Sequence, residues 1–432
     1  MILLVSDLDL GGSGYCNIAV SLAKELTDRG RKVTVLGIAY KGDEHGWPFS
    51  IIPVVMHEAW NHLPAMIQNL MAVAQAGRVD PIEAIVVALD IPHHERGFYL
   101  PRGAPGTYQA PYVGIFPVES GPLCPTWANY LARLESRLVI SQFGLDQMRD
   151  AGLAGVYLPV GIDATAWRMP EPEERRTLRE AMMLEDDETV VLTVADNQER
   201  KNLSATAKAI RAARKRGLKI RWLLVTRVYS PVGWKLPDLT AEHEITDVTM
   251  TFERGLPHDR LWVLYACADV FLLMSKAEGL CMPIVEAMAT GLPVAATDCT
   301  AVTEHLYAPD GTRRGFPVAV EYLHQDPWGN SYRHYASPES AAVTLCQIAE
   351  MRGTPELAEI IARARAYAVG RTWEQTGDIL DRELTRVIRS ARIPSVSGFV
   401  PSTMPQIVPS KLPLEGAPNE QETPPPQRPP GW

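Results

Sequence analysis

The sequence lacks any apolar run close to the roughly 20 residues that a helix needs to cross a bilayer. It also lacks a basic leader, because its first residues, Met-Ile-Leu-Leu-Val-Ser-Asp, are typical of a core strand rather than of a signal peptide. We therefore expect a cytoplasmic protein without a transmembrane segment.

Cysteine is scarce, and its spacing is not that of a metal site. Several of the six cysteines fall in segments that we expect to be buried; they stand at positions 16, 124, 267, 281, 299 and 346. Reduced thiols in a cytosolic protein are the simplest interpretation.

Positive charge is in the minority. The formal net charge is −9, so the composition gives no sign of a strongly basic surface for nucleic acid. One local basic run, at residues 208–221, falls mostly on a predicted helix that ends at Gly217. We expect a solvated outer face there. Attraction to nucleic acid, or to anionic lipid in a peripheral membrane contact, is the alternative.

The chain has enough apolar sequence for two domains. It holds 432 residues, of which 46% are hydrophobic and 22% charged, as in ordinary globular proteins. Residues 2–6 and 32–38 are predicted strands, separated by the glycine-rich loop 11–14 and a helix that closes at Gly30. This βαβ unit resembles a Rossmann-like domain. However, Asn17 stands where the dinucleotide fingerprint has its last glycine or alanine, which disfavours a dinucleotide oxidoreductase.

Strands and helices continue to alternate, which predicts mostly parallel sheets. Further strands are predicted at residues 84–89, 111–116, 138–140, 156–158, 189–195, 221–226, 248–251, 270–274 and 293–297. The pattern restarts near residue 189, so we expect two consecutive α/β domains joined near residues 161–170. The last 40 residues hold eleven prolines and little periodicity, which predicts a disordered tail.

Two glutamates carry the strongest functional signal. The apolar run 268–274 predicts a buried strand, and Pro283 suits the first turn of a helix that Gly291 ends. Glu278 is thus expected on the loop after the strand, and Glu286 in the first turn of the helix. Free N–H groups at a helix start bind phosphate, and carboxylates accept hydrogen bonds from hydroxyls. A sugar nucleotide offers both groups.

The segment that begins at Glu278 is Glu-Gly-Leu-Cys-Met-Pro-x-x-Glu-Ala-Met-Ala-x-Gly-x-Pro-Val. It resembles the donor-binding signature of retaining GT-B glycosyltransferases of family 4, the glycosyl transferases group 1. The resemblance implies an α/β GT-B fold, with two Rossmann-like domains facing across a cleft and a disordered Pro-rich C-terminal tail. The implied parts are an acceptor domain at 1–163, a nucleotide-sugar donor domain at 164–372, a closing helix at 373–391 and the tail at 392–432.

The resemblance also implies roles for single residues. Glu278 would contact the transferred sugar, and Glu286 the ribose hydroxyls of the nucleotide. Cys281 stands where many relatives have glycine, and its side chain narrows the expected site. The implied donor-binding set is Gly12, Lys201, Glu278, Gly279, Leu280, Cys281, Met282, Pro283 and Glu286.

The family also has a basic pair, approximately Gly-Arg-x4-Lys, that binds the diphosphate. Here Ala195 and Asp196 replace the first two residues, and the lysine falls on Lys201. Losing the arginine removes a bidentate phosphate clamp, and Arg200 is the expected substitute. Fixed cations and a helix N-terminus can stabilise a departing phosphate, so we expect no metal and no cofactor beyond the donor substrate itself.

The acceptor side offers weaker candidates. His93 and His94 follow one predicted strand and Glu119 follows another, at strand ends expected to face the same cleft. His94 joins Glu278, Lys201 and Arg200 as a catalytic candidate. Asp7-x-Asp9 looks like the metal-binding motif of another glycosyltransferase fold, but its place on the first loop makes coincidence the better interpretation.

We therefore expect a hexosyltransferase-type enzyme that uses a nucleoside diphosphate sugar. Retention of anomeric configuration, by front-face displacement, is implied by the resemblance alone. The alternatives are another GT-B chemistry, such as a sugar-nucleotide epimerase, and a non-catalytic sugar-nucleotide-binding protein. The acceptor stays open among a lipid, a glycan, a protein, a small molecule and a modified nucleic-acid base.

Overall fold

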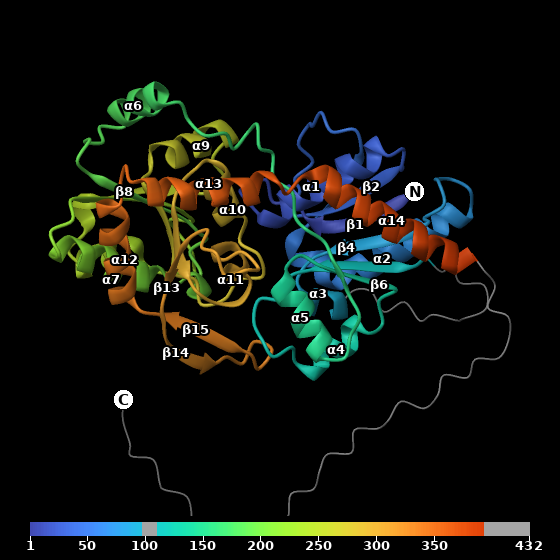
Figure 1. Cartoon of the computed structure of the whole chain (residues 1–432). Coiled ribbons are helices and arrows are strands. Elements are labelled where there is room, and N and C mark those ends of the chain that lie inside the picture. The colour runs from blue at the N-terminus through green and yellow to red at the C-terminus, as the bar shows by residue number, and fades with distance from the viewer. Residues whose placement is uncertain (97–109, 393–432) are drawn as a thin grey trace, which may run out of the picture. The chain divides into compact units, whose positions relative to one another are not determined.

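Two parallel sheets organise the chain (Figure 1). The computed structural model describes residues 1–96 and 110–392. Within residues 1–392, which form one compact unit, we call the first sheet with its helices the first lobe and the second sheet with its helices the second lobe. The disordered tail expected at 392–432 lies, from residue 393 on, outside the described residues.

The first sheet has the order β3-β2-β1-β4-β5-β6-β7, and every neighbouring pair is parallel. Its central strands are buried along their whole length, as parallel strands covered on both faces must be. The strands are β1 (Ile2–Asp7), β2 (Val33–Ile38), β3 (Ser50–Val54), β4 (Ala84–Ala88), β5 (Tyr112–Phe116), β6 (Ser136–Val139) and β7 (Val156–Tyr157). The helices are α1 (Gly14–Asp28), α2 (Met56–Gln75), α3 (Ile91–Arg96), α4 (Pro125–Leu131) and α5 (Gln142–Asp150).

The second sheet has the order β10-β9-β8-β11-β12-β13 and is also parallel. Its strands are β8 (Thr189–Val194), β9 (Ile220–Thr226), β10 (Thr249–Glu253), β11 (Val270–Leu273), β12 (Val294–Thr297) and β13 (Phe316–Val318). The helices are α6 (Pro172–Ala181), α7 (Leu203–Lys215), α8 (Leu236–Glu242), α9 (His258–Cys267), α10 (Met282–Ala289), α11 (Thr300–Leu306), α12 (Pro338–Glu350) and α13 (Pro355–Val369). An antiparallel hairpin, β14 (Val320–Gln325) and β15 (Tyr332–Ala336), follows β13.

The expected fold class of two Rossmann-like α/β units is confirmed, and the predicted strands lie within a few residues of the observed ones. Four strands were missed. The edge strand β3 contains Pro53, which weakens a strand signal, and β13 spans only three residues. The hairpin β14–β15 stands apart from both sheets.

The last described helix, α14 (Trp373–Arg392), returns to the first lobe and packs beside α1 (Figure 1). Its apolar side chains, among them Leu380 and Leu384, are buried in a core cluster of that lobe. Arg29 and Arg31 of the first lobe form ion pairs of 2.7 Å each with Asp378 and Asp381. Both apolar and ionic contacts thus fix the helix in this position.

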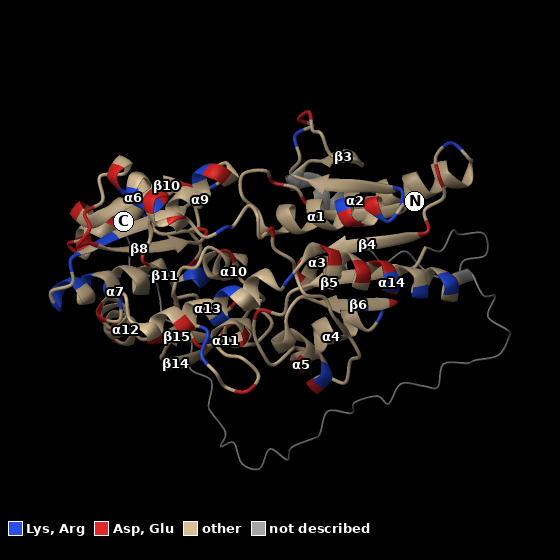
Figure 2. Cartoon of the chain, turned by 45° about the horizontal axis from the view of Figure 1, so that its top comes forward, with Lys and Arg blue, Asp and Glu red and all other residues tan. Residues whose placement is uncertain are grey.

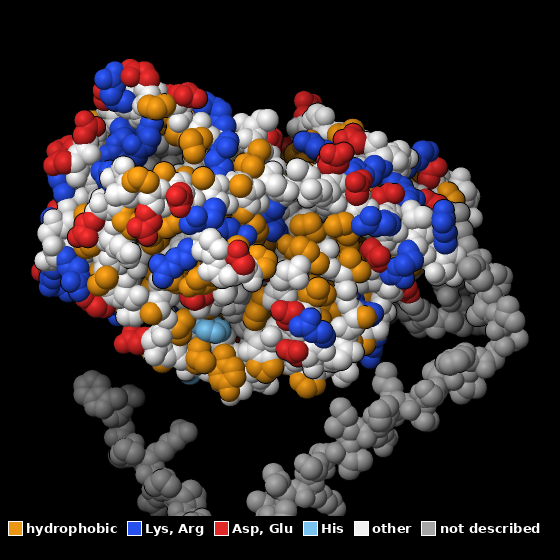
Figure 3. All heavy atoms as spheres, viewed as in Figure 1, with side chains coloured by type: hydrophobic (Ala, Val, Ile, Leu, Met, Phe, Trp, Pro, Cys, Tyr) orange, Lys and Arg blue, Asp and Glu red, His pale blue; other side chains and the backbone are white. Residues whose placement is uncertain are grey.

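The basic run at residues 208–221 is paired with acidic neighbours. Arg214 lies 2.6 Å from Asp247, and Arg211 lies 2.8 Å from Glu244. Figure 2 shows Lys, Arg, Asp and Glu interspersed along the ribbon, and Figure 3 shows charges of both signs on one face of the molecule. These contacts fit the expected solvated outer face. Among the described residues, none of the helices combines the length and the apolar character needed to cross a membrane.

Candidate active site

The Glu278 loop connects β11 to α10 at the carboxyl edge of the second sheet. Pro283 lies in the first turn of α10, as the sequence predicts. The helix begins at Met282, however, so Glu286 is its fifth residue and lies in the second turn. The expectation of a first-turn position for Glu286 was therefore wrong. Cys281, in a left-handed conformation, is the N-cap, so the helix already begins one residue before Pro283.

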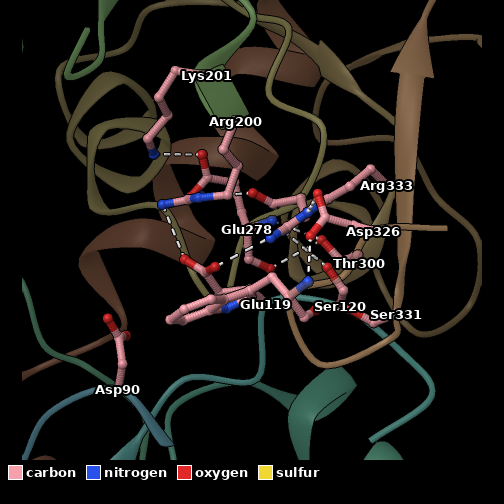
Figure 4. A network of polar contacts seen from close by, with 12 residues as sticks. Asp90, Glu119, Ser120, Arg200, Lys201, Glu278, Thr300, Asp326, Ser331 and Arg333 are labelled. Carbon is pink, nitrogen blue, oxygen red and sulfur yellow. Dashed lines mark hydrogen bonds and ion pairs between the residues drawn. The ribbon is translucent and has the colours of Figure 1, made fainter. Parts of the chain in front are cut away.

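Glu278 lies between two cations. Its side chain is nearly buried, with Lys201 Nζ 2.6 Å from Oε1 and Arg200 Nη1 3.0 Å from Oε2 (Figure 4). Burial opposes the charge, but Lys201 and Arg200 outweigh it and lower the pKa of Glu278 to about 2. The carboxylate is therefore ionised throughout the physiological pH range.

Two strained residues hold the Glu278 loop. Cys281 has φ +75° and Thr300 has φ +47°, a left-handed conformation that side chains with a Cβ rarely adopt. The Thr300 hydroxyl donates to the Glu278 carbonyl oxygen at 2.9 Å and accepts from the Glu278 N–H at 3.0 Å. Such a strained backbone is kept in place only by the contacts around it, and strain of this kind is often found at functional sites.

Arg200 joins the two lobes. It donates to the Ala277 carbonyl oxygen at 2.6 Å and lies 2.9 Å from Glu119, which follows β5 of the first lobe. Burial raises the pKa of Glu119, and the Arg200 cation acts against that rise. The structure therefore brings Glu119, a sequence-predicted acceptor candidate, next to the predicted donor residues Arg200 and Glu278 (Figure 4).

Glu286 lies in a different environment. It is buried, and Tyr265 donates a hydrogen bond of 2.9 Å to its Oε2. Burial raises the pKa of Glu286 to about 7, although the Tyr265 hydrogen bond lowers it. Glu278 and Glu286 thus differ in charge near neutral pH. A contact from ribose hydroxyls would favour the ionised form of Glu286.

Asp196, which replaces the family arginine, is not an isolated negative charge. Its Oδ2 lies 3.1 Å from Arg227 and 3.7 Å from Arg254. Arg254 also pairs with Asp9 of the first lobe at 2.7 Å. Two arginines that the sequence analysis did not single out therefore neutralise Asp196, beside the loop that carries Lys201.

Backbone approaches backbone where the lobes meet. Gly12 has φ +99°, and a Cβ there would lie 3.0 Å from the Gly255 nitrogen of the second lobe. A Cβ on Gly279 would lie 2.3 Å from the Cβ of Pro117, so a side chain is excluded at that position. Leu280 is buried in a core cluster of the first lobe, against which Met282 packs. These four members of the predicted donor-binding set thus lie at the seam between the lobes.

The two histidines lie on the short helix α3 after β4. His94 is buried, its Nε2 lies 3.1 Å from the Leu89 carbonyl oxygen, and its ring packs edge-on against Phe116. Burial lowers the pKa of His94 to about 4, so the ring is neutral at physiological pH. His93 is partly exposed. Neither residue lines the pocket described next.

Asp7 and Asp9 order their own loop. Asp7 accepts hydrogen bonds from the Ser13 hydroxyl and the Asp9 N–H, at 2.7 and 2.9 Å. Asp9 accepts from the Gly11 N–H and pairs with Arg254. Within residues 1–96 and 110–392, no group of three or more His, Cys, Asp or Glu residues could hold a metal ion. Both aspartates thus order the loop between β1 and α1.

A small pocket of about 20 Å³ lies beside Glu119, between the first lobe and the hairpin of the second lobe. Its walls include Asp90, Trp127, Trp328 and Ser331, none of which was predicted as a site residue. Asp90 could have been found, because it follows β4 directly. Trp328 precedes a Gly-Asn turn with positive φ at both residues, and Gly-Asn between two strand-like runs is a hairpin signal.

Comparisons with solved structures define the class of this fold. A glycosyltransferase from Rickettsia africae aligns with a TM-score of 0.67 and 14% identity, over 90% of this chain and 98% of that chain. The Anabaena protein HepE, solved with UDP-glucose, aligns with a TM-score of 0.65 and 16% identity, over 89% and 99% of the two chains. At such low identity the likeness concerns the fold, which is GT-B as the sequence predicted.

A family model then gives the group within this class. Residues 188–326 match the family model described as glycosyl transferases group 1. The D-inositol 3-phosphate glycosyltransferase of Mycobacterium bovis is 29% identical over 259 residues, 59% of this chain and 47% of that protein. The chain spans between about a fifth and a half of the length of the curated relatives it matches.

Proposed function

We propose that this protein transfers a glycosyl group, of the hexosyl type, from a nucleoside diphosphate sugar to an acceptor. The transfer would proceed with retention at the anomeric carbon. The observation that carries this proposal is the Glu278 carboxylate, held between Lys201 and Arg200 beside the start of α10. The carboxylate can accept hydrogen bonds from sugar hydroxyls, and the two cations can bind a diphosphate. A sugar linked to a diphosphate requires both kinds of group at one place.

In the proposed reaction, Glu278 accepts hydrogen bonds from hydroxyls of the transferred sugar. Lys201 and Arg200, with the free N–H groups at the start of α10, stabilise the negative charge of the departing diphosphate. The bond from the anomeric carbon to the phosphate oxygen breaks, and the acceptor oxygen bonds to the same face. The acceptor proton passes to the departing phosphate. Fixed cations supply the charge stabilisation here, so we propose that the reaction needs no metal.

We assign Glu286 to the ribose hydroxyls and Gly12 to the diphosphate. The neighbouring residues of the loop, from Gly279 to Pro283, would line the donor site through their backbone. His94 is buried against Phe116. We therefore assign it to positioning the acceptor side from beneath rather than to contact with the substrate.

UDP-glucose is the first donor to test, because HepE, which shares the fold, has been solved with this compound. A curated relative of this chain acts, by its name, on D-inositol 3-phosphate, which makes small hydroxylated acceptors a reasonable starting class. All six cysteines are free, which fits the proposed cytoplasmic location.

A thermal-shift screen of UDP-, GDP- and ADP-sugars tests donor binding, since a ligand that binds only the folded state raises Tm. Turnover of the selected donor should fall about a hundredfold in Lys201→Ala and in Glu278→Ala. Lys219→Ala is the matched control, because Lys219 is an exposed lysine that pairs with Glu185 and Asp187 away from this site.

The products distinguish the alternatives. An epimerised nucleotide sugar would indicate an epimerase, and selective donor binding without turnover would indicate a non-catalytic binding protein. Stabilisation by none of these sugar nucleotides, or full activity in both site variants, would overturn the proposal.

A further inference from the structure

Two arginines of the second lobe each hold a carboxylate of the first lobe. Arg200 lies 2.9 Å from Glu119, and Arg254 lies 2.7 Å from Asp9. Arg200 belongs to the proposed donor site. Arg254, which follows β10 directly, has the same relation to the first lobe, since its partner carboxylate also comes from a loop after a strand of the first sheet.

Arg254 borders both elements that the proposed function assigns to the diphosphate. The next residue, Gly255, approaches Gly12, because a Cβ on Gly12 would lie 3.0 Å from the Gly255 nitrogen. Arg254 Nη1 also lies 3.7 Å from the Oδ2 of Asp196, at the start of the loop that carries Lys201. An anion bound between Gly12 and this loop would therefore be within reach of the Arg254 guanidinium group.

The Arg254 side chain keeps unused hydrogen-bond donors. A guanidinium group has five N–H donors, but within residues 1–96 and 110–392 this one makes a single hydrogen bond, from Nη2 to Asp9 Oδ2. Its 3.7 Å contact with Asp196 is too long for a second hydrogen bond. The side chains of Arg254 and Asp9 are 23% and 32% exposed, so solutes can reach the pair. A phosphate group can use more of these donors than one carboxylate oxygen does.

Asp196 does not depend on Arg254 for its hydrogen bonds. It accepts from Arg227 Nε and Nη2 at 3.3 and 3.1 Å, from the Gln198 amide at 3.0 Å, and from the Asn197 N–H at 3.0 Å. These contacts balance the negative charge that replaces the family arginine. Arg254 is therefore available to an anion, with Asp9 as its competing partner.

We propose that Arg254 binds the diphosphate of the donor, and that the Asp9 carboxylate occupies this arginine until the donor displaces it. The inference rests on the proposed transferase function and adds an anion-binding residue to the donor site. It also adds a competitor within the chain itself. Asp9 thus lowers the apparent affinity for the donor, because its ion pair with Arg254 has to open before a phosphate group can take its place.

Asp9→Asn tests the competition. The amide oxygen can still accept from the Gly11 N–H, as Asp9 Oδ1 does at 2.9 Å, but the ion pair with Arg254 is lost. We expect the dissociation constant of UDP, measured by calorimetry, to fall at least threefold, on the scale of a partly exposed ion pair. Damage to the fold would not produce such a gain of affinity. An unchanged or weaker affinity would overturn the inference.

Arg254→Met tests the phosphate contact. The affinity for UDP should fall at least tenfold, whereas the affinity for uridine, which has no phosphate and is measured by competition against UDP, should change less than threefold. Arg254→Lys keeps a positive charge and should recover part of the loss. Equal losses for UDP and uridine in folded Arg254→Met, or an unchanged affinity for UDP, would contradict the assignment.

The double variant separates competition from simple repulsion between Asp9 and the phosphates. If Asp9 acts by holding Arg254, Asp9→Asn should no longer raise the affinity for UDP once Arg254 is methionine. The same gain with and without Arg254 would show that Asp9 acts by repulsion alone, and would overturn the inference.

Arg214 and Asp247 provide a matched control pair. They form an exposed ion pair of 2.6 Å between α7 and the segment before β10, outside the proposed site. Arg214→Met and Asp247→Asn should therefore leave the affinities for UDP and uridine within twofold of the wild type. A comparable gain of affinity in Asp247→Asn would show that the loss of any carboxylate has this effect, and would overturn the inference.

The wild-type protein separates the two proposals. If the donor screen selects another nucleotide, the diphosphate and the nucleoside of that base replace UDP and uridine. Absence of binding to any of these nucleoside diphosphates and their sugars would overturn the transferase function. Normal binding by the wild type, with no change in Asp9→Asn and Arg254→Met, would overturn only the assignment of Arg254 and Asp9.

Discussion

Lys201 Nζ lies 2.6 Å from the Oε1 of Glu278, although the two residues are 77 positions apart in the sequence. This contact joins the loop after β8 to the loop after β11 at one edge of the second sheet. Removal of Glu278 leaves Lys201 and Arg200 without this nearly buried carboxylate, whereas removal of Lys201 leaves Glu278 with Arg200 alone. The same ion pair therefore contributes both to the stability of the Glu278 loop and to the proposed reaction.

Glu278→Gln should abolish most activity without a dependence on pH. The pKa of Glu278 is lowered to about 2, so the wild-type carboxylate is fully charged at every pH above about 4. The amide keeps the shape but loses the charge, and we expect kcat/KM for the donor to fall about a hundredfold between pH 5 and 9. The control is Glu242→Gln, at the exposed C-terminal end of α8. Retention of more than a tenth of the activity would contradict the role of the charge.

The stability of the protein should depend on pH through the ionisation of Glu286. Burial raises its folded-state pKa to about 7, against 4.5 in a model peptide. Between these values the folded state keeps a proton that the unfolded chain has lost, so stability falls as pH rises from about 4.5 to 7 and is constant above. Glu286→Gln removes this loss, and its free energy of unfolding relative to wild type should rise by roughly 3 kcal/mol from pH 4.5 to 8. Chemical denaturation at both pH values measures it, and a constant difference would contradict the buried pKa.

Binding of the donor should release a proton from the same residue. Ribose hydroxyls that donate to Glu286 favour its ionised form, so affinity for UDP-glucose should increase as pH rises toward 7 and level off above it. Calorimetry in two buffers with different heats of ionisation detects the released proton. The release should disappear in Glu286→Gln, and Glu286→Ala should weaken nucleotide binding itself. An unchanged affinity in Glu286→Ala would count against the ribose contact.

The contact between Arg200 and Glu119 should show strong coupling between the lobes. Arg200→Met leaves the buried Glu278 and the partly buried Glu119 without this cation, and we expect a loss of about 3 kcal/mol in the free energy of unfolding. Glu119→Gln should cost less, because Arg200 keeps Glu278 as a partner. The double variant should therefore be more stable than the sum of the two losses predicts, by about 1 kcal/mol. Additive losses in a double-mutant cycle would show that the contact carries no coupling.

Cys281 offers a test of backbone strain. At φ +75° a glycine is unstrained, whereas cysteine and alanine are not. Cys281→Gly should therefore be more stable than Cys281→Ala by about 1 kcal/mol, the reverse of the usual order near a helix. The alanine variant is the control, since it also removes the thiol. Thermal unfolding compares the two, and a more stable alanine variant would exclude strain at this position.

The sequence was sufficient for the parts of the fold that local patterns encode. The apolar runs of β1, β4 and β11 identify strands buried on both faces, and Pro283 with Gly291 brackets α10 to within two residues. Arg200 was expected to bind the diphosphate and Glu278 the sugar, but the contact between the two residues was not predicted. Its geometry depends on the meeting of two loops, which one sequence does not encode locally.

The acceptor side was the least predictable region. Glu119 was singled out from its position after a strand, but its partners Arg200 and Arg333 come from the second lobe. The hairpin β14–β15 lies outside both sheets. The alternation of strands and helices, which identifies a parallel sheet, therefore did not predict it. His93 and His94 were singled out by residue type and by their position after a strand, whereas burial decides what such a ring can contact.

The meeting of Gly12 with Gly255 has a consequence for how this protein can vary. Since neither residue carries a side chain, the distance between the two lobes at this point is set by main-chain atoms alone. A methyl group added at either position would lie 3.0 Å from backbone of the other lobe, on a residue with positive φ, so the main chains would have to move apart by a few tenths of an ångström. Glycine at both positions therefore sets how closely the two lobes can meet at this point.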